Sequence, residues 1–372
     1  MNLSSSDLSP ILTYSQQFHR NIEPSDGNIV ASPLGSWLLL TALAVSLNYE
    51  ENPELEQLME TKLCCSLDEA FTLYDEITRH PDVHYTAKVW GSGENMKFFP
   101  AVTDWWEANR VLPADTSLQL PSQKELDDWA SENTDGLIKK FPLESDENMV
   151  LLAANAVYSK LSWVYPFAVT EDTDMRETWA VQSFLTSREH SVLFRKYADV
   201  VYATVYIPAR KGEQVQLFLP LEDVEDDVLT DAMFELLNPT RGAVLSYTDV
   251  PAVPGLVEHH KIAATYGPVF DLIVPAWSAE TKHDLTVDDS FGFISLMNAF
   301  EKGKAEGEHL VAQATQSAVA EFTAEGFEAA AVTAFGFEAA AVFTPHTEQD
   351  LVVLKFSKAF GFVCRVDNIP VF

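Results

Sequence analysis

The sequence predicts a single α+β domain over residues 1–372, with large, mostly antiparallel sheets and helices packed on them. Three observations lead to this prediction. Hydrophobic residues make up 47% of the chain and aromatic residues 11%, which is ample for a core. Helix signals gather in the first half, whereas strand candidates dominate the second half. Proline and glycine are scattered, so no linker divides the chain.

The first clear helix start lies at Ser32, which is followed by Pro33. Serine is a favourable N-cap, and proline is favoured at the first helical position. Residues 34–47 are apolar nearly all round. This pattern predicts a buried helix.

A second helix is predicted after a capping box, which residues 122–125 (SQKE) provide. Gly136 is expected near the end of this helix. The positions that follow helical spacing are Leu126, Trp129, Ala130 and Leu137.

Residues 149–158 (MVLLAANAVY) form a continuous apolar run, which is typical of a strand covered on both faces. The later strand candidates are short runs rich in apolar, β-branched or aromatic residues. They are residues 200–207, 215–219, 270–274, 318–323 and 351–356.

One seven-residue unit, GFEAAAV, occurs twice, at 326–332 and at 336–342. Its small residues suit an exposed loop, and they can also enter a sheet because small side chains clash with nothing there. The alternative from these residues alone is a surface helix or a flexible linker, since alanine has the best helix propensity.

The sequence carries no recognisable catalytic or metal-binding pattern. It has no G-x-S-x-G, no Walker loop and no G-x-G-x-x-G. The three cysteines, Cys64, Cys65 and Cys364, fit neither a disulfide framework nor a zinc site. We therefore expect no catalytic residue, no metal, no cofactor and no enzyme activity.

The net charge is −32, from 56 acidic and 24 basic residues. Such an acidic field favours solubility and repels nucleic acid, anionic lipid and heparin. The longest apolar run, 34–47, falls short of the ~20 residues that a membrane span needs. We expect a monomer without nucleic-acid, membrane or heparin partners.

Four strings, in the same order along the chain, resemble motifs of the serpin family, in its prokaryotic type. Residues 28–34 (NIVASPL) resemble N-x-V-F-S-P-L, and residues 129–138 resemble W-x4-T-x-G-x-I. Residues 155–167 (NAVYSKLSWVYPF) resemble N-A-I-Y-F-K-G-x-W-x3-F, and residues 326–333 (GFEAAAVT) resemble G-T-E-A-A-A-x-T. Together they indicate this family over nearly the whole chain.

The resemblance implies a suicide inhibitor of serine proteases, with an exposed reactive loop at about 325–350. In this family a chymotrypsin-like, elastase-like or subtilisin-like protease cuts the loop and forms an acyl-enzyme. The cut loop then enters the central sheet as a new strand, and the release of stored strain distorts the protease. The alternative is a non-inhibitory serpin that is cleaved as a substrate or acts as a binding or storage protein. A hydrolase with an unrecognised site is a third reading.

The resemblance also implies the functional positions. The residues of the sheet-opening region are Ser32, Asn155, Trp163 and Gln316. The hinge, where the loop would begin to insert, comprises Glu325, Gly326, Phe327, Glu328, Ala329, Ala330 and Ala331. Family spacing from Gly326 puts the cleaved bond at Ala340-Ala341, whereas counting back from Phe356 puts it near Glu348, with Phe343-Thr344 as the alternative bond. The two counts disagree, so the loop is longer than usual.

Two departures from the family pattern concern the hinge and the sheet opening. Phe327 stands where the family has threonine, so we expect a bulky side chain that has to be buried first during insertion. Gln316 stands where the family has histidine, which we expect to remove a hydrogen-bonding group from the sheet opening.

In a β-strand successive side chains point to opposite faces of the sheet, and the same alternation is expected in the inserted loop. One face would carry Phe327, Ala329, Ala331, Thr333 and Phe335, and the other Glu328, Ala330, Val332, Ala334 and Gly336. The first face can be buried, and the second turns its glutamate to solvent. The pattern is therefore compatible with insertion.

The family resemblance implies an extracellular location. Residues 1–18, however, lack a charged start followed by an apolar stretch, so no signal peptide is expected. A cytoplasmic location is the alternative.

Overall fold

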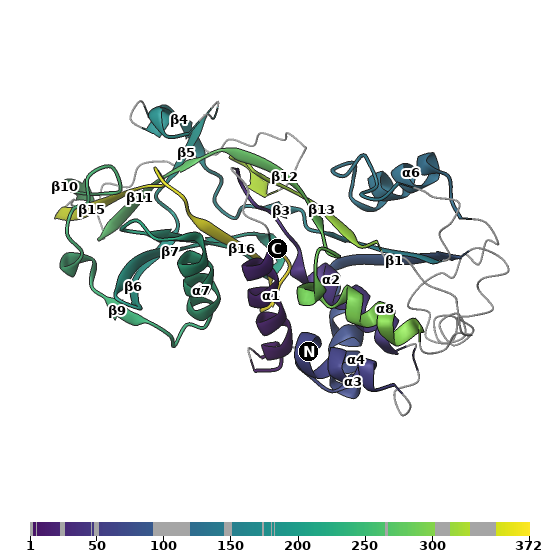
Figure 1. Cartoon of the computed structure of the whole chain (residues 1–372). Coiled ribbons are helices and arrows are strands. Elements are labelled where there is room, and N and C mark those ends of the chain that lie inside the picture. Colours follow the sequence, from purple (N-terminus) through teal and green to yellow (C-terminus); the bar gives the residue numbers. More distant parts are fainter. Residues whose placement is uncertain are drawn as a thin grey trace. The chain divides into compact units, whose positions relative to one another are not determined.

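The structure is a computed structural model (Figure 1), and it describes residues 3–4, 6–22, 27–45, 47, 52–91, 120–144, 151–172, 175–179, 181, 183–264, 267–301, 313–327 and 347–372. The chain divides into two compact units. The first comprises Met1–Ser159, Ala279–Val319 and Asn368–Phe372. The second comprises Lys160–Ser278 and Ala320–Asp367. That the chain forms one domain stays a prediction.

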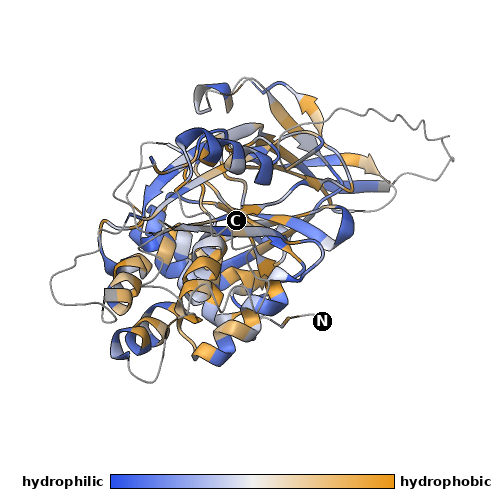
Figure 2. Ribbon diagram, turned by 90° about the vertical axis from the view of Figure 1, so that its right-hand side faces the viewer, coloured by the Kyte–Doolittle hydropathy of each residue, from blue (hydrophilic) through white to orange (hydrophobic). Residues whose placement is uncertain are grey.

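The first unit contains most of the helices, and the predicted buried helix is α2, Pro33–Val45. Every residue from Pro33 to Ala44 is buried, as the apolar pattern predicts. The N–H of Gly35 donates to Ser32 Oγ over 3.4 Å, which confirms Ser32 as the cap. The neighbouring helices are α1 (Ser9–Asn21), α3 (Pro53–Leu58), α4 (Leu67–Thr78) and α8 (Phe293–Glu301). In Figure 2 the helices carry both orange and blue residues, as helices with one face on a core do.

The predicted capping box is confirmed at the start of α6, Gln123–Asn133. The N–H of Ser122 donates to Glu125 Oε2 over 2.8 Å, and the N–H of Glu125 donates back to Ser122 Oγ. The expected helical placement of Leu137 is wrong, because the helix ends at Asn133 and the chain turns through Gly136, whose φ is +80°. Glycine adopts this left-handed conformation without strain.

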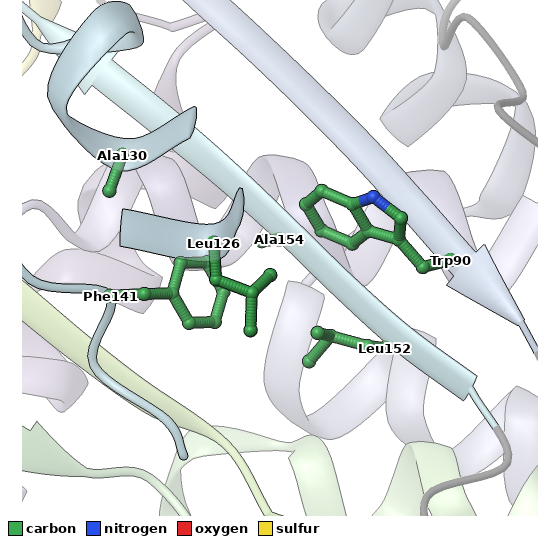
Figure 3. Packing of buried hydrophobic residues seen from close by; sticks show 6 residues of the cluster. All are labelled: Trp90, Leu126, Ala130, Phe141, Leu152 and Ala154. Carbon is green, nitrogen blue, oxygen red and sulfur yellow. The ribbon is translucent and has the colours of Figure 1, made fainter. Parts of the chain in front are cut away.

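A hydrophobic cluster joins α6 to the strands β1 (His84–Gly91) and β2 (Leu151–Tyr158), which pair antiparallel. Figure 3 shows its buried members, Trp90, Leu126, Ala130, Phe141, Leu152 and Ala154. The predicted strand at 149–158 is confirmed as β2 over residues 151–158, but only alternate residues (Leu152, Ala154 and Ala156) are fully buried. The other face is half-buried, because α2 packs against it.

The second unit is built mainly from two sheets (Figure 1), which confirm the predicted dominance of strands. One has the order β16-β8-β7-β6-β9. Its strands are Gly361–Val366, Glu213–Pro220, Val200–Pro208, Ser191–Tyr197 and Ala243–Leu245, and all four pairings are antiparallel. The helix α7 (Asp226–Leu237) packs on β16.

The other sheet has the order β10-β15-β11-β5-β4. Its strands are Val257–Ala264, Thr347–Lys355, Val269–Pro275, Phe184–Ser187 and Ala168–Thr170. β15 lies between β10, to which it is antiparallel, and β11, to which it is parallel. The strand that follows the proposed loop is therefore hydrogen-bonded along both edges.

All five of the later strand candidates are confirmed, as β7, β8, β11, β13 (Thr315–Phe322) and β15. No specific sequence pattern predicted the helices α1, α3, α4, α7 and α8. The same holds for the strands β1, β5, β6, β10, β12 (Trp277–Asp284) and β16. Strand β10 (VEHHKIAA) shows why, since its polar side chains alternate on an exposed face and leave a weak apolar signal.

Candidate functional site

The beginning of the predicted hinge folds back as a tight turn, residues 322–327, which we call the hinge turn. It joins β13 to the short strand β14, Gly326–Phe327. β14 pairs antiparallel with β13 on one side, Phe322 opposite Phe327. On its other side it pairs with β3 (Leu161–Ser162). The first two residues of the GFEAAAV unit therefore already lie between two strands in the intact chain.

Trp163 takes part in closing the hinge turn. In an ordinary β-turn the N–H of the fourth residue donates to the carbonyl of the first. Here the carbonyl of Thr323 accepts a hydrogen bond from Trp163 Nε1 over 3.0 Å. The N–H of Gly326 donates to Thr323 Oγ1 over 3.2 Å, and the N–H of Thr323 donates to the Gly326 carbonyl over 2.9 Å. The Thr323 hydroxyl thus accepts the hydrogen bond from Gly326 that the Thr323 carbonyl would accept in an ordinary β-turn.

The backbone of β3 and the residues after it hold the outside of the turn. The N–H of Trp163 donates to the Glu325 carbonyl over 3.0 Å, and the N–H of Phe167 donates to the Ala324 carbonyl over 2.8 Å. Trp163 itself is 1% exposed. Residues 323–326 (TAEG) are therefore held by hydrogen bonds from residues distant in the chain.

Phe327 is 3% exposed in the intact chain. Its ring lies 6.3 Å from Trp277 and 5.8 Å from Phe362, measured between ring centroids. Phe322 stacks on Trp277 at an interplanar angle of 12°. The expectation that Phe327 has to be buried first during insertion is therefore wrong, because this aromatic cluster already buries it.

Gly326 is required by the close approach of two backbones. A Cβ atom at this position would lie 2.1 Å from the carbonyl oxygen of Leu161. No side chain fits at such a distance, so a residue other than glycine would separate β14 from β3.

In the first unit, Gln316 and Ser32 form a connected set of hydrogen bonds. The N–H of Ser32 donates to Gln316 Oε1 over 2.9 Å. Gln316 Nε2 donates to the Ser32 carbonyl over 2.8 Å and to Ser36 Oγ over 3.0 Å. The expected loss of a hydrogen-bonding group at Gln316 is therefore wrong, because the amide can donate and accept at once.

Ser32 and Asn155 also tie α2 to its surroundings within the first unit. Ser32 Oγ donates to the Val371 carbonyl over 2.7 Å. Asn155 Nδ2 donates to the Gly35 carbonyl over 2.5 Å. The structure thus joins Ser32 to Gln316 and Asn155 to α2 in one unit, and Trp163 to the hinge turn in the other.

The remaining predicted site residues, Glu328, Ala329, Ala330, Ala331, Ala340, Ala341, Phe343 and Thr344, lie outside the described residues. The sequence reading did not single out Thr323, Trp277 or Phe362. No local pattern marks them, because their role comes from contacts between segments far apart in the chain.

His190 packs on Phe167, whose N–H donates to the hinge turn, and its burial predicts a pH dependence of stability. Its ring lies 4.7 Å from that of Phe167, and neither ring nitrogen has a hydrogen-bond partner among the described residues. Burial lowers the pKa of His190 to about 4, from 6.5. The unfolded chain therefore binds the proton more readily between pH 6.5 and 4, and folding stability falls as the pH falls through this range, by up to ~1.4 kcal/mol per pH unit.

We expect His190→Phe to flatten this part of the pH profile. Urea unfolding at several pH values between 7 and 4 would measure it, with Val244→Ala, an exposed position, as the control variant. Parallel profiles of the wild type and His190→Phe would contradict the argument.

Within the part of the chain that the structure describes, no group of three or more His, Cys, Asp or Glu side chains could hold a metal ion. Among the same residues, no helix is both long and apolar enough to cross a membrane.

The sequence and the fold of this chain are similar to those of known proteins. Residues 13–371 match the family described as Serpin (serine protease inhibitor). A search of curated proteins finds no match. Among solved structures, human glycosylated kallistatin is similar with a TM-score of 0.65 and 15% identity, over 99% of this chain and 96% of that one. Serpin48 of the insect Tenebrio molitor gives 0.63 and 13%, over 99% and 96%. Human thyroxine-binding globulin, complexed with thyroxine, gives 0.59 and 16%, over 98% of each chain. At these identities the similar structures establish the fold alone.

Proposed function

The chain belongs to the serpin family, and we propose that it acts as a suicide inhibitor of serine proteases. The observation that carries the proposal is the hinge turn, which starts the GFEAAAV unit as a strand between β13 and β3. Small residues follow it at 329–331. A strand that is already begun needs only the rest of the loop to be freed.

The two ends of the loop differ in a way that suits this mechanism. Upstream, the loop leaves from the hinge turn, within the sheet. Downstream it runs into β15, which pairs with β10 and β11 and starts at Thr347. A cut upstream of Thr347 therefore frees the upstream part to move and leaves the downstream part anchored. A cut near Glu348 would instead fall inside β15, where Glu348 pairs with Ala263.

The register at the hinge turn supports insertion of the following residues. Phe322 lies opposite Phe327 in an antiparallel pair, so the same register continued would bring Ala329 opposite Ala320. Ala320 is buried. The GFEAAAV unit supplies alanine at this position, a small side chain that can be buried without an unpaired polar group.

Incubation with a chymotrypsin-like or elastase-like protease tests the proposal. A denaturing gel is expected to show a covalent complex that survives boiling in detergent. Catalytically inactive protease, with its nucleophilic serine replaced by alanine, is the control and forms no such complex. Quantitative cleavage of the chain with full protease activity remaining would reject inhibition.

The second candidate function is a non-inhibitory serpin, cleaved as a substrate or acting as a binding or storage protein. The lengthened loop favours it. Added length costs little stability, about 0.6 kcal/mol per doubling, but the slack delays insertion and gives the protease time to hydrolyse the acyl-enzyme. The thyroxine complex of thyroxine-binding globulin is a binding function within this fold.

We expect the inhibited protease to prefer small or aromatic residues. The window 340–348 offers Ala340-Ala341 to an elastase-like pocket and Phe343-Thr344 to a chymotrypsin-like or subtilisin-like one, and it contains no Lys or Arg. Mass spectrometry of the released C-terminal fragment would locate the bond. A trapped trypsin complex would contradict this preference.

The partner is therefore proposed to be a serine protease that meets a monomeric inhibitor. An extracellular location is proposed from family membership, and a cytoplasmic one is the alternative.

A further inference from the structure

The side chain of Phe327 fills an aromatic site in the second unit. The site is made by Trp277 and Phe362, whose ring centroids lie 5.0 Å apart. The centroid of the Phe327 ring lies 6.3 Å from that of Trp277 and 5.8 Å from that of Phe362. The three rings meet at 49–70°. Such tilted and edge contacts are the favourable arrangement of aromatic pairs. The site therefore suits a flat, apolar side chain.

The backbone of the hinge turn alone gives weak anchorage. Its hydrogen bonds to Trp163 and Phe167 replace bonds that the same groups would make to water, so each adds only a small net stabilisation. The two residues of β14 are also too few to form a stable strand by themselves. Burial of the Phe327 ring is the remaining contribution, and it is non-directional and large.

We propose that Phe327 is a positioning residue that docks the hinge before any protease arrives. By holding β14 between β13 and β3 it fixes the register from which the loop would continue. The consequence for inhibition depends on the proposed function, but the docking itself does not.

Hydrogen exchange of the intact, uncleaved chain tests the docking without a protease. We expect the amides of Thr323 and Gly326, which donate to the Gly326 carbonyl and to Thr323 Oγ1, to be protected in the wild type. They should exchange about 100-fold faster in Phe327→Ala, which removes a buried ring. Phe327→Leu, which keeps apolar bulk, should stay within about tenfold of the wild type. Val244→Ala is the control at an exposed position, and β7 serves in every variant as the reference for global folding.

A second variant covers the case in which Phe327→Ala fails to fold. Gly326→Ala leaves the ring in place but puts a Cβ atom against the Leu161 carbonyl, so it should release the same amides. Unprotected amides in the wild type, or unchanged exchange in the variants that fold, would overturn the proposal.

A protease assay then measures the consequence for the loop. If docking fixes the register, Phe327→Ala should raise the number of chains cleaved per protease trapped by about tenfold, and Phe327→Leu should restore the wild-type value. Faster exchange with an unchanged ratio would overturn the positioning role. A wild type that traps no protease would reject the proposed function, while the exchange result would stand on its own.

Discussion

Cleavage of the loop between 340 and 346 is expected to raise the melting temperature by at least about 10 °C. The freed residues after Phe327 would enter the sheet as a central strand. Such a strand adds on the order of ten main-chain hydrogen bonds at ~0.5–1.5 kcal/mol each. Phe335, on the same face as Phe327, would add roughly 1.5–3 kcal/mol if it fits. The sum is comparable to the whole stability of an ordinary domain, ~5–15 kcal/mol.

Phe327 contributes nothing further to this gain, because it is 3% exposed before cleavage. The C-terminal fragment is expected to stay bound, since β15 is paired on both edges and Lys355 forms ion pairs with Asp172 and Glu258 at 3.3 and 3.1 Å. The melting temperature of the cleaved protein therefore reports on the whole fold rather than on a remnant.

Differential scanning calorimetry of the intact and the cleaved chain would measure the shift. The control is the intact chain mixed with inactivated protease, which should melt unchanged. An equal melting temperature before and after cleavage would mean that the loop does not insert and that the chain is a serpin in fold only.

Ala331→Glu is expected to abolish protease trapping and to leave a substrate. Phe327 is buried in β14, so the residues at 329, 331 and 333 would share its face in a continued strand. A glutamate at 331 would then be an unpaired charge within the sheet, which costs several kcal/mol. Insertion would stop before the protease is distorted, and the acyl-enzyme would be hydrolysed.

Ala330→Glu is the matched control, because it adds the same charge one residue away on the face that turns to solvent. It should keep the covalent complex and the rise in melting temperature. A denaturing gel and calorimetry of both variants after cleavage would separate the two positions. Equal trapping by the two variants would contradict the assigned faces.

Several features of the fold could be read from short patterns. The buried helix after Ser32 and the capped helix after Ser122 follow from local signals, since caps and apolar periodicity act within one or two turns. The strands β7, β8, β11, β13 and β15 follow from short runs of apolar, β-branched and aromatic residues. β10 and β12 escaped because their exposed faces weaken that signal.

The site was predictable only in part. Trp163 and Gly326 were identified through the motifs that resemble the serpin family, and in the structure Trp163 donates hydrogen bonds to the hinge turn that contains Gly326. Their partners Thr323, Trp277 and Phe362 were not identified, because nothing in the local sequence distinguishes them from other threonines and core aromatics.

The family, the α+β class and the small-residue pattern after Gly326 follow from residue types at short spacings. The state of the hinge depends on contacts between segments far apart in the chain. Phe327 looks like an obstacle in the sequence, yet Trp277 and Phe362 already bury it, and Gln316 looks like a lost hydrogen bond, yet it bonds to Ser32 and Ser36. The physical reason is the same in both cases: whether burying a side chain costs or gains free energy depends on the partners that the fold brings to it, and those partners lie far away in the chain.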